Sequence, residues 1–439
     1  MGVFRKDIFS RVAKIRAEKL KHHQTMQFPK NFFWGTSTSA HQVEGDNYYN
    51  DWWAWEHGKK NRRRSLKACD HYERFEEDFG LLKKMHQNAH RISVEWSRFE
   101  PEEDVWNPEA VKHYRRVLES LKEKGITPFV TIHHFTNPQW FMEKGGWENR
   151  KSPEYFSHFV ERLVKELGDL TTFWITINEP LVYSTMSYLF GIWPPQKKNY
   201  ISTYRVYRNL ARAHKRAYSI IHKTHEKYRW KKPNVGISVN SVSFYSYKKH
   251  EFFSWLFLRV ADWLWNHSFF ALTGKTHDFI GINYYFHYRF KLNHFRTLQF
   301  FVEARHEHRE MSSVGWEVYP QGIFDVLMDL KRHNLPMYVT ENGIASRNES
   351  KRTRYLVSYV KEVYHAIQAG ADVRGYFYWS FLDNFEWEKG FRPRFGLLDV
   401  NYKTQKRSFR HAARIYSEIA SANSLLHKHL RYLGHSVSP

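Results

Sequence analysis

An α/β fold of eight repeated strand–helix units in a single domain is predicted from three observations. Short runs rich in β-branched and aromatic residues alternate with longer segments in which apolar residues recur every three or four positions along the 439 residues. Eight such short runs occur, and no linker rich in Pro, Gly or Ser divides them. Units of this kind close into a (β/α)8 barrel, the TIM barrel, which can extend past about 400 residues as one domain.

The predicted strands are short and rich in β-branched and aromatic residues, as in FVTIH of the third and FWITIN of the fourth. In chain order they are residues 32–40, 89–96, 127–134, 173–178, 235–240, 279–284, 337–341 and 375–381. The segments between them have helical periodicity. The helices expected there include residues 110–124, 153–167, 204–225, 322–333 and 351–369. We expect a basic arm over residues 1–25, the barrel over 26–425 and a tail over 426–439.

Polar residues gather where the predicted strands end, and in a barrel these ends form the face that carries the active site. The polar and aromatic residues at or just after strand ends are Glu95, Trp96, Ser97, Arg98, His133, His134, Asn178, Glu179, Asn283, Tyr284, Tyr285, Glu341, Asn342, Trp379, Ser380, Asp383, Asn384, Glu386 and Trp387. Glu179 and Glu341 follow the fourth and seventh strands, on opposite sides of the expected mouth. Two carboxylates among amides and aromatic rings indicate acid/base or nucleophilic chemistry on a sugar.

Eight sequence motifs occur in a fixed order over nearly the whole chain. They are FPKNFFWGTSTSAHQVEG, HRISVEWSR, HHFTNPQW, TINEP, DFIGINYY, YVTENG, YWSFLDNFEW and FGLLDV. Several of them lie at successive strand ends, which makes the combination very specific. By these motifs the sequence resembles the family 1 glycoside hydrolases, the retaining β-glucosidases and β-glycosidases.

The resemblance implies that Glu179 of TINEP is the acid/base and that Glu341 of YVTENG is the nucleophile. It also assigns contacts with the substrate: Gln42, His134, Glu386 and Trp387 to the sugar hydroxyls, Asn178 to the 2-hydroxyl, and Trp379 to stacking on the ring. Tyr285 is expected beside the nucleophile, and Arg91 and Asn283 are expected to support the site.

General chemistry agrees with two carboxyl groups in different protonation states. Cleavage with retention needs a protonated carboxyl at the leaving oxygen and a carboxylate at the anomeric carbon, about 5 to 5.5 Å apart. A cation such as Arg91 and a hydroxyl donor such as Tyr285 would favour the ionised form of Glu341. Glu179, which is partly desolvated and faces a negative neighbour, is expected to hold its proton near neutral pH.

Each sugar-contacting residue also has a purely structural interpretation. Gln42 could close a turn, His134 could be a hydrogen-bonded core histidine, Trp379 could fill the barrel, and Arg91 could be an ion-pair partner. The whole chain could likewise be a catalytically weak sugar-binding or interaction protein that docks through a basic surface. Glu at both catalytic positions favours the enzyme, because a decayed enzyme is expected to lose one of the two.

Composition and charge restrict the ligands and partners that we expect for this chain. The chain has 68 Lys and Arg against 45 Asp and Glu, a net charge of +23, but no basic block dominates, so we expect no nucleic-acid partner. The expected ligand is a small β-glycoside. Cys69 is the single cysteine, which excludes an intramolecular disulfide and a thiolate metal cluster. We expect no metal and no cofactor, and the oligomeric state stays open.

The N-terminal arm and the lack of long apolar runs bear on the localisation of the protein. Phe4, Ile8, Val12 and Ile15 have helical spacing among basic residues, so the arm could form an amphipathic helix on a membrane or docked on the domain. No continuous apolar run suits a secretory signal or a membrane span. We therefore expect a cytoplasmic protein without stable membrane insertion.

The sequence departs from the family pattern at two places. Phe135 and Asn137 stand in HHFTNPQW where Trp and Leu are usual, so the loop after the third strand is expected to shape the site differently. The connection over residues 241–278 is shorter than usual and crowded with aromatic residues. Their helical spacing predicts a buried packing face, with a surface for hydrophobic ligands as the alternative, and the entrance on that side is expected to be more open.

Overall fold

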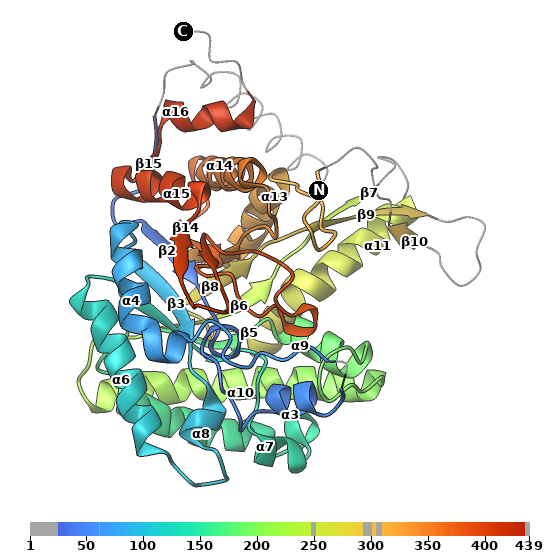
Figure 1. Cartoon of the computed structure of the whole chain (residues 1–439). Coiled ribbons are helices and arrows are strands. Elements are labelled where there is room, and N and C mark those ends of the chain that lie inside the picture. Colours follow the sequence, from blue (N-terminus) through green and yellow to red (C-terminus); the bar gives the residue numbers. More distant parts are fainter. Residues whose placement is uncertain (1–24, 61, 247–251, 293–300, 304–309, 435–439) are drawn as a thin grey trace.

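The computed structural model describes residues 25–60, 62–246, 252–292, 301–303 and 310–434, with a closed barrel of parallel strands at its centre (Figure 1). The strands are β2 (Phe33–Ser37), β3 (Ala89–Ser93), β4 (Thr127–His133), β5 (Phe173–Asn178), β6 (Asn234–Asn240), β8 (Phe279–Asn283), β11 (Met337–Asn342) and β12 (Val373–Trp379). They neighbour one another in chain order, and β12 pairs in parallel with β2. The predicted barrel is confirmed, with every strand within a few residues of its expected bounds.

Amphipathic helices cover the outside of the barrel. The longer ones are α4 (His71–Lys84), α6 (Pro108–Glu123), α8 (Ser152–Leu167), α10 (Tyr200–Lys227), α13 (Gln321–Leu330), α14 (Glu349–Gln368) and α15 (His411–Ala422). The start of α6 follows from its sequence, because the Asn107 side chain accepts hydrogen bonds from the backbone N–H groups of Glu109 and Ala110. Pro108 stands at the first helical position, where its missing N–H costs nothing. The five predicted helices are all present.

Short helices form much of the mouth of the barrel. One other short helix, η4 (Lys331–His333), directly follows α13 instead. The helices of the mouth are α2 (Ala40–Val43), α3 (Asp51–His57), α5 (Trp96–Phe99), α7 (Gln139–Glu143), η1 (Gly146–Glu148), α9 (Pro180–Ser184), η2 (Thr185–Leu189) and η5 (Trp387–Lys389), which come after the C-terminal ends of barrel strands. They therefore shape the face on which polar strand-end residues converge.

An aromatic layer fills the barrel near the beginnings of its strands. Its members are Phe33, Phe129, Phe173, Phe279, Tyr338 and Phe377. The rings of Phe129 and Phe173 stack with centroids 4.1 Å apart. Gly35 leaves room for this layer, since a Cβ atom there would lie 2.6 Å from the Phe377 ring. The layer closes the end of the barrel away from the mouth.

The connection after β6 is more structured than the sequence indicated. It contains β7 (Ser243–Ser246), α11 (Phe252–Asp262), the π-helical turn η3 (Trp263–His267) and α12 (Ser268–Thr273). A small sheet of order β10–β9–β7 adds β9 (His287–Leu292) and β10 (Phe301–Glu303), and α11 packs against it outside the barrel (Figure 1). Phe269 and Phe270 are buried as expected, but Trp255 and Trp263 are half-exposed. The predicted buried aromatic face is therefore only partly correct.

The two ends of the barrel domain lie together. β1 (Met26–Gln27) pairs antiparallel with β15 (Ser424–Leu425), and β13 (Leu398–Val400) pairs with β14 (Arg407–Phe409). Beyond β15 the tail forms α16 (His427–Leu430) and η6 (Arg431–Leu433). The expected basic arm lies, apart from residue 25, outside the described residues. Among the helices that the structure describes, none has the length and apolar character needed to cross a membrane.

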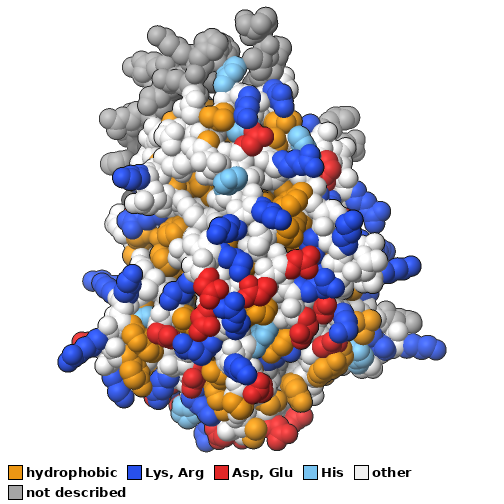
Figure 2. All heavy atoms as spheres, turned by 60° about the vertical axis from the view of Figure 1, so that its left-hand side comes forward, with side chains coloured by type: hydrophobic (Ala, Val, Ile, Leu, Met, Phe, Trp, Pro, Cys, Tyr) orange, Lys and Arg blue, Asp and Glu red, His pale blue; other side chains and the backbone are white. Residues whose placement is uncertain are grey.

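Charged side chains are dispersed over the face shown in Figure 2, where Lys and Arg lie among Asp and Glu. This view brings forward the side of the molecule that carries α4 and α6. An exposed ion pair between Arg116 and Glu76 links these helices, and the partly buried Lys124, just after α6, also pairs with Glu76. Such exposed pairs contribute little stability each. On this face the excess of positive charge is therefore not gathered into one patch.

Candidate active site

The two carboxylates singled out from the sequence both lie at the barrel mouth. Glu341 is in β11, and Glu179 directly follows β5, where its backbone is left-handed with φ +45°. Both side chains are buried. Asn283 donates to Glu179, and Arg91 donates both to Glu341 and to Asn178, the residue before Glu179. The structure thus places the pair close together.

Glu341 is held by a cation and a hydroxyl group. Arg91, from β3, donates to its Oε1, and the Tyr285 hydroxyl, just after β8, donates to its Oε2 at 2.6 Å. Burial raises the pKa of Glu341 above its ordinary value, whereas the charge of Arg91 and the hydrogen bonds from Tyr285, Arg91 and Asn283 lower it. These contacts favour the ionised carboxylate that a nucleophile requires.

Glu179 lies in the opposite electrostatic setting. Burial and the charge of Glu341 raise its pKa to about 8, and hydrogen bonds from Asn283 and Asn240 only partly offset this. The amide of Asn283 donates to Glu179 Oε1 at 2.8 Å and that of Asn240 at 3.2 Å. At neutral pH Glu179 therefore holds a proton that it can transfer.

An amide network fixes the relative positions of the two carboxylates. Asn178 Oδ1 accepts hydrogen bonds from Arg91 Nη2 at 2.6 Å and from Asn283 Nδ2 at 3.1 Å. Asn283 Oδ1 in turn accepts from the Thr340 hydroxyl at 2.7 Å. Because Arg91 can only donate, the orientation of the Asn178 amide is determined. Residues from β3, β5, β8 and β11 are thus tied into one preorganised cluster.

His134, which follows β4, offers a free donor beside this cluster. The amide of Asn178 donates to its Nε2 at 3.2 Å, and burial lowers the pKa of His134 well below its ordinary value. The ring is therefore neutral, with its proton on Nδ1. Among the residues that the structure describes, no group accepts a hydrogen bond from this buried Nδ1. A ligand hydroxyl could satisfy it.

Gln42 and Glu386 form a polar wall of the mouth. Gln42 Nε2 lies 3.3 Å from Glu386 Oε2 and 2.9 Å from the Phe385 carbonyl, and its Oε1 accepts from the Ser39 hydroxyl at 2.7 Å. Burial raises the pKa of Glu386 to about 8, while the charge of Lys389 opposes the shift. The wall combines an amide and a carboxyl group, both of which can hydrogen-bond hydroxyl groups of a ligand.

Aromatic rings lie beside the polar wall. The ring of His134 is nearly parallel to those of Trp379 and Trp387, with centroids 6.1 and 6.2 Å away. His41 also stacks with Trp387, with ring centroids 5.8 Å apart. The structure therefore brings together the eleven residues expected at the site: Gln42, Arg91, His134, Asn178, Glu179, Asn283, Tyr285, Glu341, Trp379, Glu386 and Trp387.

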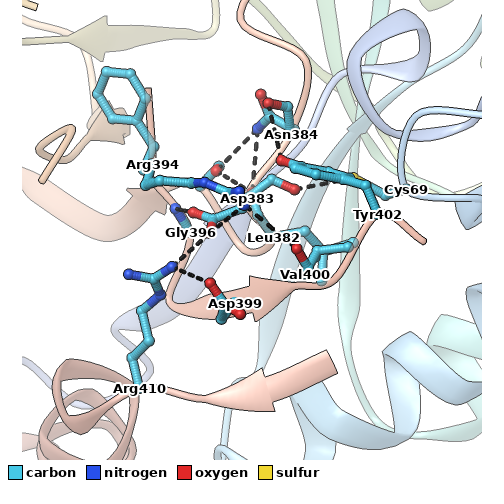
Figure 3. Close-up of polar contacts among 12 residues, drawn as sticks. Cys69, Leu382, Asp383, Asn384, Arg394, Gly396, Asp399, Val400, Tyr402 and Arg410 are labelled. Atoms are coloured by element: carbon cyan, nitrogen blue, oxygen red, sulfur yellow. Dashed lines mark hydrogen bonds and ion pairs between the residues drawn. The ribbon is translucent and has the colours of Figure 1, made fainter. Parts of the chain in front are cut away.

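Asp383 lies in the same loop as Glu386 but holds the loop rather than lining the site. Its Oδ2 accepts from Arg410 at 2.5 Å and from Arg394 at 3.2 Å, and its Oδ1 accepts from the backbone N–H of Gly396 at 2.8 Å (Figure 3). Its carbonyl lies 3.0 Å from Cys69 Sγ. These contacts fix the loop that presents Glu386 and Trp387.

The loop after β4 is also internally anchored. Asn137 donates to Asp51 Oδ2 at 2.8 Å and to the Tyr183 hydroxyl at 3.0 Å, and it accepts from the Trp147 indole at 2.8 Å. His133 Nε2 lies 3.0 Å from Asn137 Oδ1, so this histidine helps to hold the loop in place. The unusual Asn137 therefore acts as a hydrogen-bonding centre beneath the site.

Asn240 is a site residue that the sequence reasoning missed. It ends β6, donates to Glu179 and accepts from the indole of Trp265 at 3.4 Å. The strand-end rule could have identified it, since it was the last residue of the predicted fifth strand. None of the eight sequence motifs covers it.

A barrel with two buried carboxyl groups in different electrostatic settings at its mouth is the arrangement of an O-glycosyl hydrolase. Comparison with known proteins gives the family: the chain belongs to glycosyl hydrolase family 1, whose model matches residues 24–253 and 266–425. It is a β-glycosidase of that family.

Individual relatives match over nearly their whole length. Beta-glucosidase A of Thermotoga maritima is 32% identical over 451 residues, which cover 91% of this chain and 99% of that protein. A β-galactosidase of Pyrococcus woesei is 30% identical and is covered to 98% by the match, which spans 91% of this chain. A solved β-glycosidase from Pyrococcus horikoshii has a TM-score of 0.87 at 36% identity, covering 94% of this chain and 99% of that one. A β-glucosidase from Thermotoga maritima in complex with glucoimidazole has a TM-score of 0.86 at 30% identity, covering 91% and 100%.

Proposed function

We propose that the chain is a retaining, exo-acting β-glycosidase for small β-glucosides or related sugars, with Glu341 as nucleophile and Glu179 as acid/base. One observation carries the assignment of roles: Arg91 and Tyr285 donate to Glu341, whereas burial and the charge of Glu341 raise the pKa of Glu179 to about 8. These surroundings favour the ionised form of Glu341 and the protonated form of Glu179 near neutral pH, which are the two forms that retention requires.

In the first step the Glu341 carboxylate attacks the anomeric carbon while the bond from that carbon to the leaving oxygen breaks. Glu179 gives its proton to the leaving oxygen, so the aglycone departs as a neutral alcohol. The sugar is left as an ester of Glu341. Asn178, which Arg91 and Asn283 hold by hydrogen bonds, is proposed to bind the 2-hydroxyl during this step.

In the second step the same groups work in reverse. Formation of the ester removes the charge of Glu341, which had raised the pKa of Glu179. The Glu179 carboxylate can then accept a proton from water as the water oxygen attacks the anomeric carbon and the ester bond breaks. An alcohol in place of water would give transglycosylation, which we also propose for this chain.

For the sugar itself, the polar wall and the free donor support recognition of an unmodified, uncharged glycone. We propose that Gln42, Glu386 and the Nδ1–H of His134 bind its hydroxyls and that Trp379 and Trp387 contact the ring. Initial rates on nitrophenyl β-glucoside, β-galactoside and β-fucoside would rank the natural glycones.

A 6-phospho sugar is expected to be a poor substrate. Glu388 is a carboxylate in the loop that would face the phosphate, Glu386 lacks the positive charge that binds a phosphate, and Lys389 is already paired with Glu388. Placing a phosphate dianion beside these groups is unfavourable. We expect kcat/KM for a 6-phospho-β-glucoside to be at least about tenfold below that for the plain glucoside, and equal values would contradict this view of the pocket.

The roles of the two carboxylates can be separated by azide rescue. Glu341→Ala should lose hydrolysis of every substrate and, with azide and an activated β-glucoside, should form the α-glucosyl azide. Glu179→Ala should still react with a dinitrophenyl glucoside, because a good leaving group needs little protonation, and azide should then give the β-glucosyl azide. The anomeric configuration is read by NMR spectroscopy.

Glu95→Ala is the matched control for this experiment. Glu95 is buried after β3, but its carboxylate accepts from Ser97 and Thr136 rather than contacting the pair. Azide should restore no activity to this variant. The assignment would be wrong if Glu341→Ala kept its hydrolytic activity, or if the two variants gave the opposite anomers.

A further inference from the structure

An apolar strip runs along the outside of α11 and η3. Trp255, Leu256, Val260, Trp263 and Leu264 are each between 45% and 51% exposed. Their spacing places them on one side of the helix, since residues four apart lie above one another. Leu258, on the other side, is buried, and α11 packs there against β7 and β9. A contiguous exposed row of large apolar side chains marks an interaction surface.

The strip belongs to the part of the chain that the family pattern does not account for. The family model matches residues 24–253 and 266–425, so residues 254–265 lie outside it. All five side chains of the strip fall within this interval. Packing of the barrel does not explain them, because these side chains face outward.

Charge on the strip favours an anionic partner. Over residues 255–275 the exposed charged side chains that the structure describes are Arg259, within the strip, and Lys275, after α12. The carboxylate of this stretch, Asp262, is partly buried and accepts a hydrogen bond from Asn266 at 2.9 Å. Half-exposed indoles with flanking cations are typical of helices that lie at a lipid–water interface.

The strip is also fixed relative to the catalytic centre. Asn266 accepts from the Val242 backbone N–H at 3.1 Å and donates to its carbonyl at 2.8 Å, which ties η3 to the segment after β6. Trp265 donates to Asn240, and Asn240 donates to the Glu179 carboxyl. Leu264, the last residue of the strip, is therefore adjacent in sequence to Trp265, whose partner Asn240 contacts Glu179.

We propose that the apolar strip of α11 and η3 is a membrane-docking face that lies on an anionic lipid bilayer. The five apolar side chains would enter the headgroup region, and Arg259 and Lys275 would contact lipid phosphates. Docking would place the barrel mouth beside the bilayer surface without any segment crossing it. The proposal does not depend on the catalytic roles given above.

Vesicle flotation tests this proposal with the full-length protein. The wild type should float with phosphatidylglycerol vesicles and much less with phosphatidylcholine vesicles, because the lipid charge is part of the recognition. Leu256→Ser, Val260→Ser and Leu264→Ser combined should lower the partition coefficient by about tenfold or more. Tyr200→Ser, Ile201→Ser and Tyr204→Ser combined are the matched control, since these three exposed residues lie on α10.

Fluorescence gives a second, milder test. Brominated phosphatidylglycerol should quench the tryptophan emission of the wild type, and the Trp255→Phe, Trp263→Phe variant should lose that quenching. Hydrolysis of a soluble nitrophenyl glucoside should stay unchanged in all these variants, which separates loss of docking from loss of catalysis. Three outcomes would overturn the proposal: no binding to anionic vesicles, equal binding by the serine variant and the wild type, or a dimer in analytical ultracentrifugation that the serine variant abolishes.

Discussion

At the scale of single residues, the site works by giving two identical side chains different neighbours. Glu341 accepts from a guanidinium and a phenol, whereas Glu179 accepts from two neutral amides. A neutral amide stabilises a carboxylate less than a guanidinium does. Both groups are buried, and side chains from three other strands, β3, β6 and β8, contribute to the difference in their proton affinity.

Tyr285 should influence the acidic side of the pH profile. Its hydroxyl donates to Glu341 at 2.6 Å and lowers the pKa of that carboxyl. Tyr285→Phe removes the donor, so the pKa of Glu341 should rise and the acidic limb of kcat/KM should move to higher pH. We expect kcat to fall by about 10- to 100-fold. An acidic limb that stays in place, measured on nitrophenyl glucoside, would contradict this role.

Asn240 should influence the basic side of the profile. Its amide donates to Glu179 Oε1 at 3.2 Å, which stabilises the ionised form and lowers the pKa of Glu179. Asn240→Ala should therefore raise that pKa, and the basic limb of kcat/KM, expected near pH 8, should move upward. Asn234→Ala, at the opposite end of β6, is the control and should leave the limb unchanged. A shift to lower pH would exclude this interpretation.

The sequence predicted which residues form the site, but not which contacts each of them makes. Strand-end positions and motifs were sufficient for Glu179, Glu341 and Asn283, because barrel topology brings such positions together. Asp383 has the same kind of position but is engaged by Arg394 and Arg410, which come from later in the chain. Contacts between residues far apart in sequence depend on packing that no local pattern contains.

At the scale of elements, the loop after β12 depends on its ionic anchor. Asp383 is fully buried, while Arg394 and Arg410 are partly exposed. The loop carries Glu386 and Trp387 at its far end. Its conformation should therefore affect binding of the glycone more than the chemical step.

Asp383→Asn tests this anchor. The amide leaves two guanidinium groups without their buried counter-charge, so the free energy of unfolding should fall by about 3 kcal/mol. KM should rise while kcat changes little. Asp372→Asn is the control, because its pair with Arg374 is exposed on both sides and should change stability by about 1 kcal/mol or less. Urea unfolding and steady-state kinetics provide the two measurements, and equal losses in both variants would refute the anchor role.

For helix α11 the sequence pattern predicts the helix but not which of its sides is buried. Its periodic aromatic residues correctly indicated a helix, but periodicity alone does not say which side meets the protein. Trp255 and Trp263 are exposed because β7 and β9 cover the opposite side. The strands of this small sheet are paired across more than 40 residues of sequence, as between Ser243 and His287, so the covered side could not be foreseen.

At the scale of the whole molecule, the buried acids of the site should make stability depend on pH. The pKa values of Glu179 and Glu386 rise from 4.5 to about 8 in the folded chain, mainly through burial. A group that binds its proton more tightly when folded contributes its full stability below the unfolded value, near pH 4.5. That contribution is lost as the pH rises through the folded value, near pH 8.

Glu179→Gln and Glu386→Gln should therefore stabilise the protein progressively as the pH rises. The gain in unfolding temperature over the wild type should be small at pH 5 and largest at pH 8 to 9, where it corresponds to a few kcal/mol. Asp78→Asn is a control of opposite sign. Burial alone would raise the pKa of Asp78, but His71 and Arg407 lower it overall, so this substitution should destabilise the protein most at neutral pH. Calorimetry across the pH range measures the gain in unfolding temperature. A gain that does not grow with pH would contradict the prediction.

The aromatic layer at the base of the barrel has a consequence for the products. Phe129, Phe173 and their neighbours fill the interior beneath the two carboxylates, so water and an acceptor alcohol must reach the glycosyl ester through the same opening. Water and the alcohol then compete for the same path to the anomeric carbon. For the transglycosylation proposed above, the proportion of new glycoside to free sugar should therefore rise with the ratio of acceptor to water, so a lower water activity should favour synthesis over degradation.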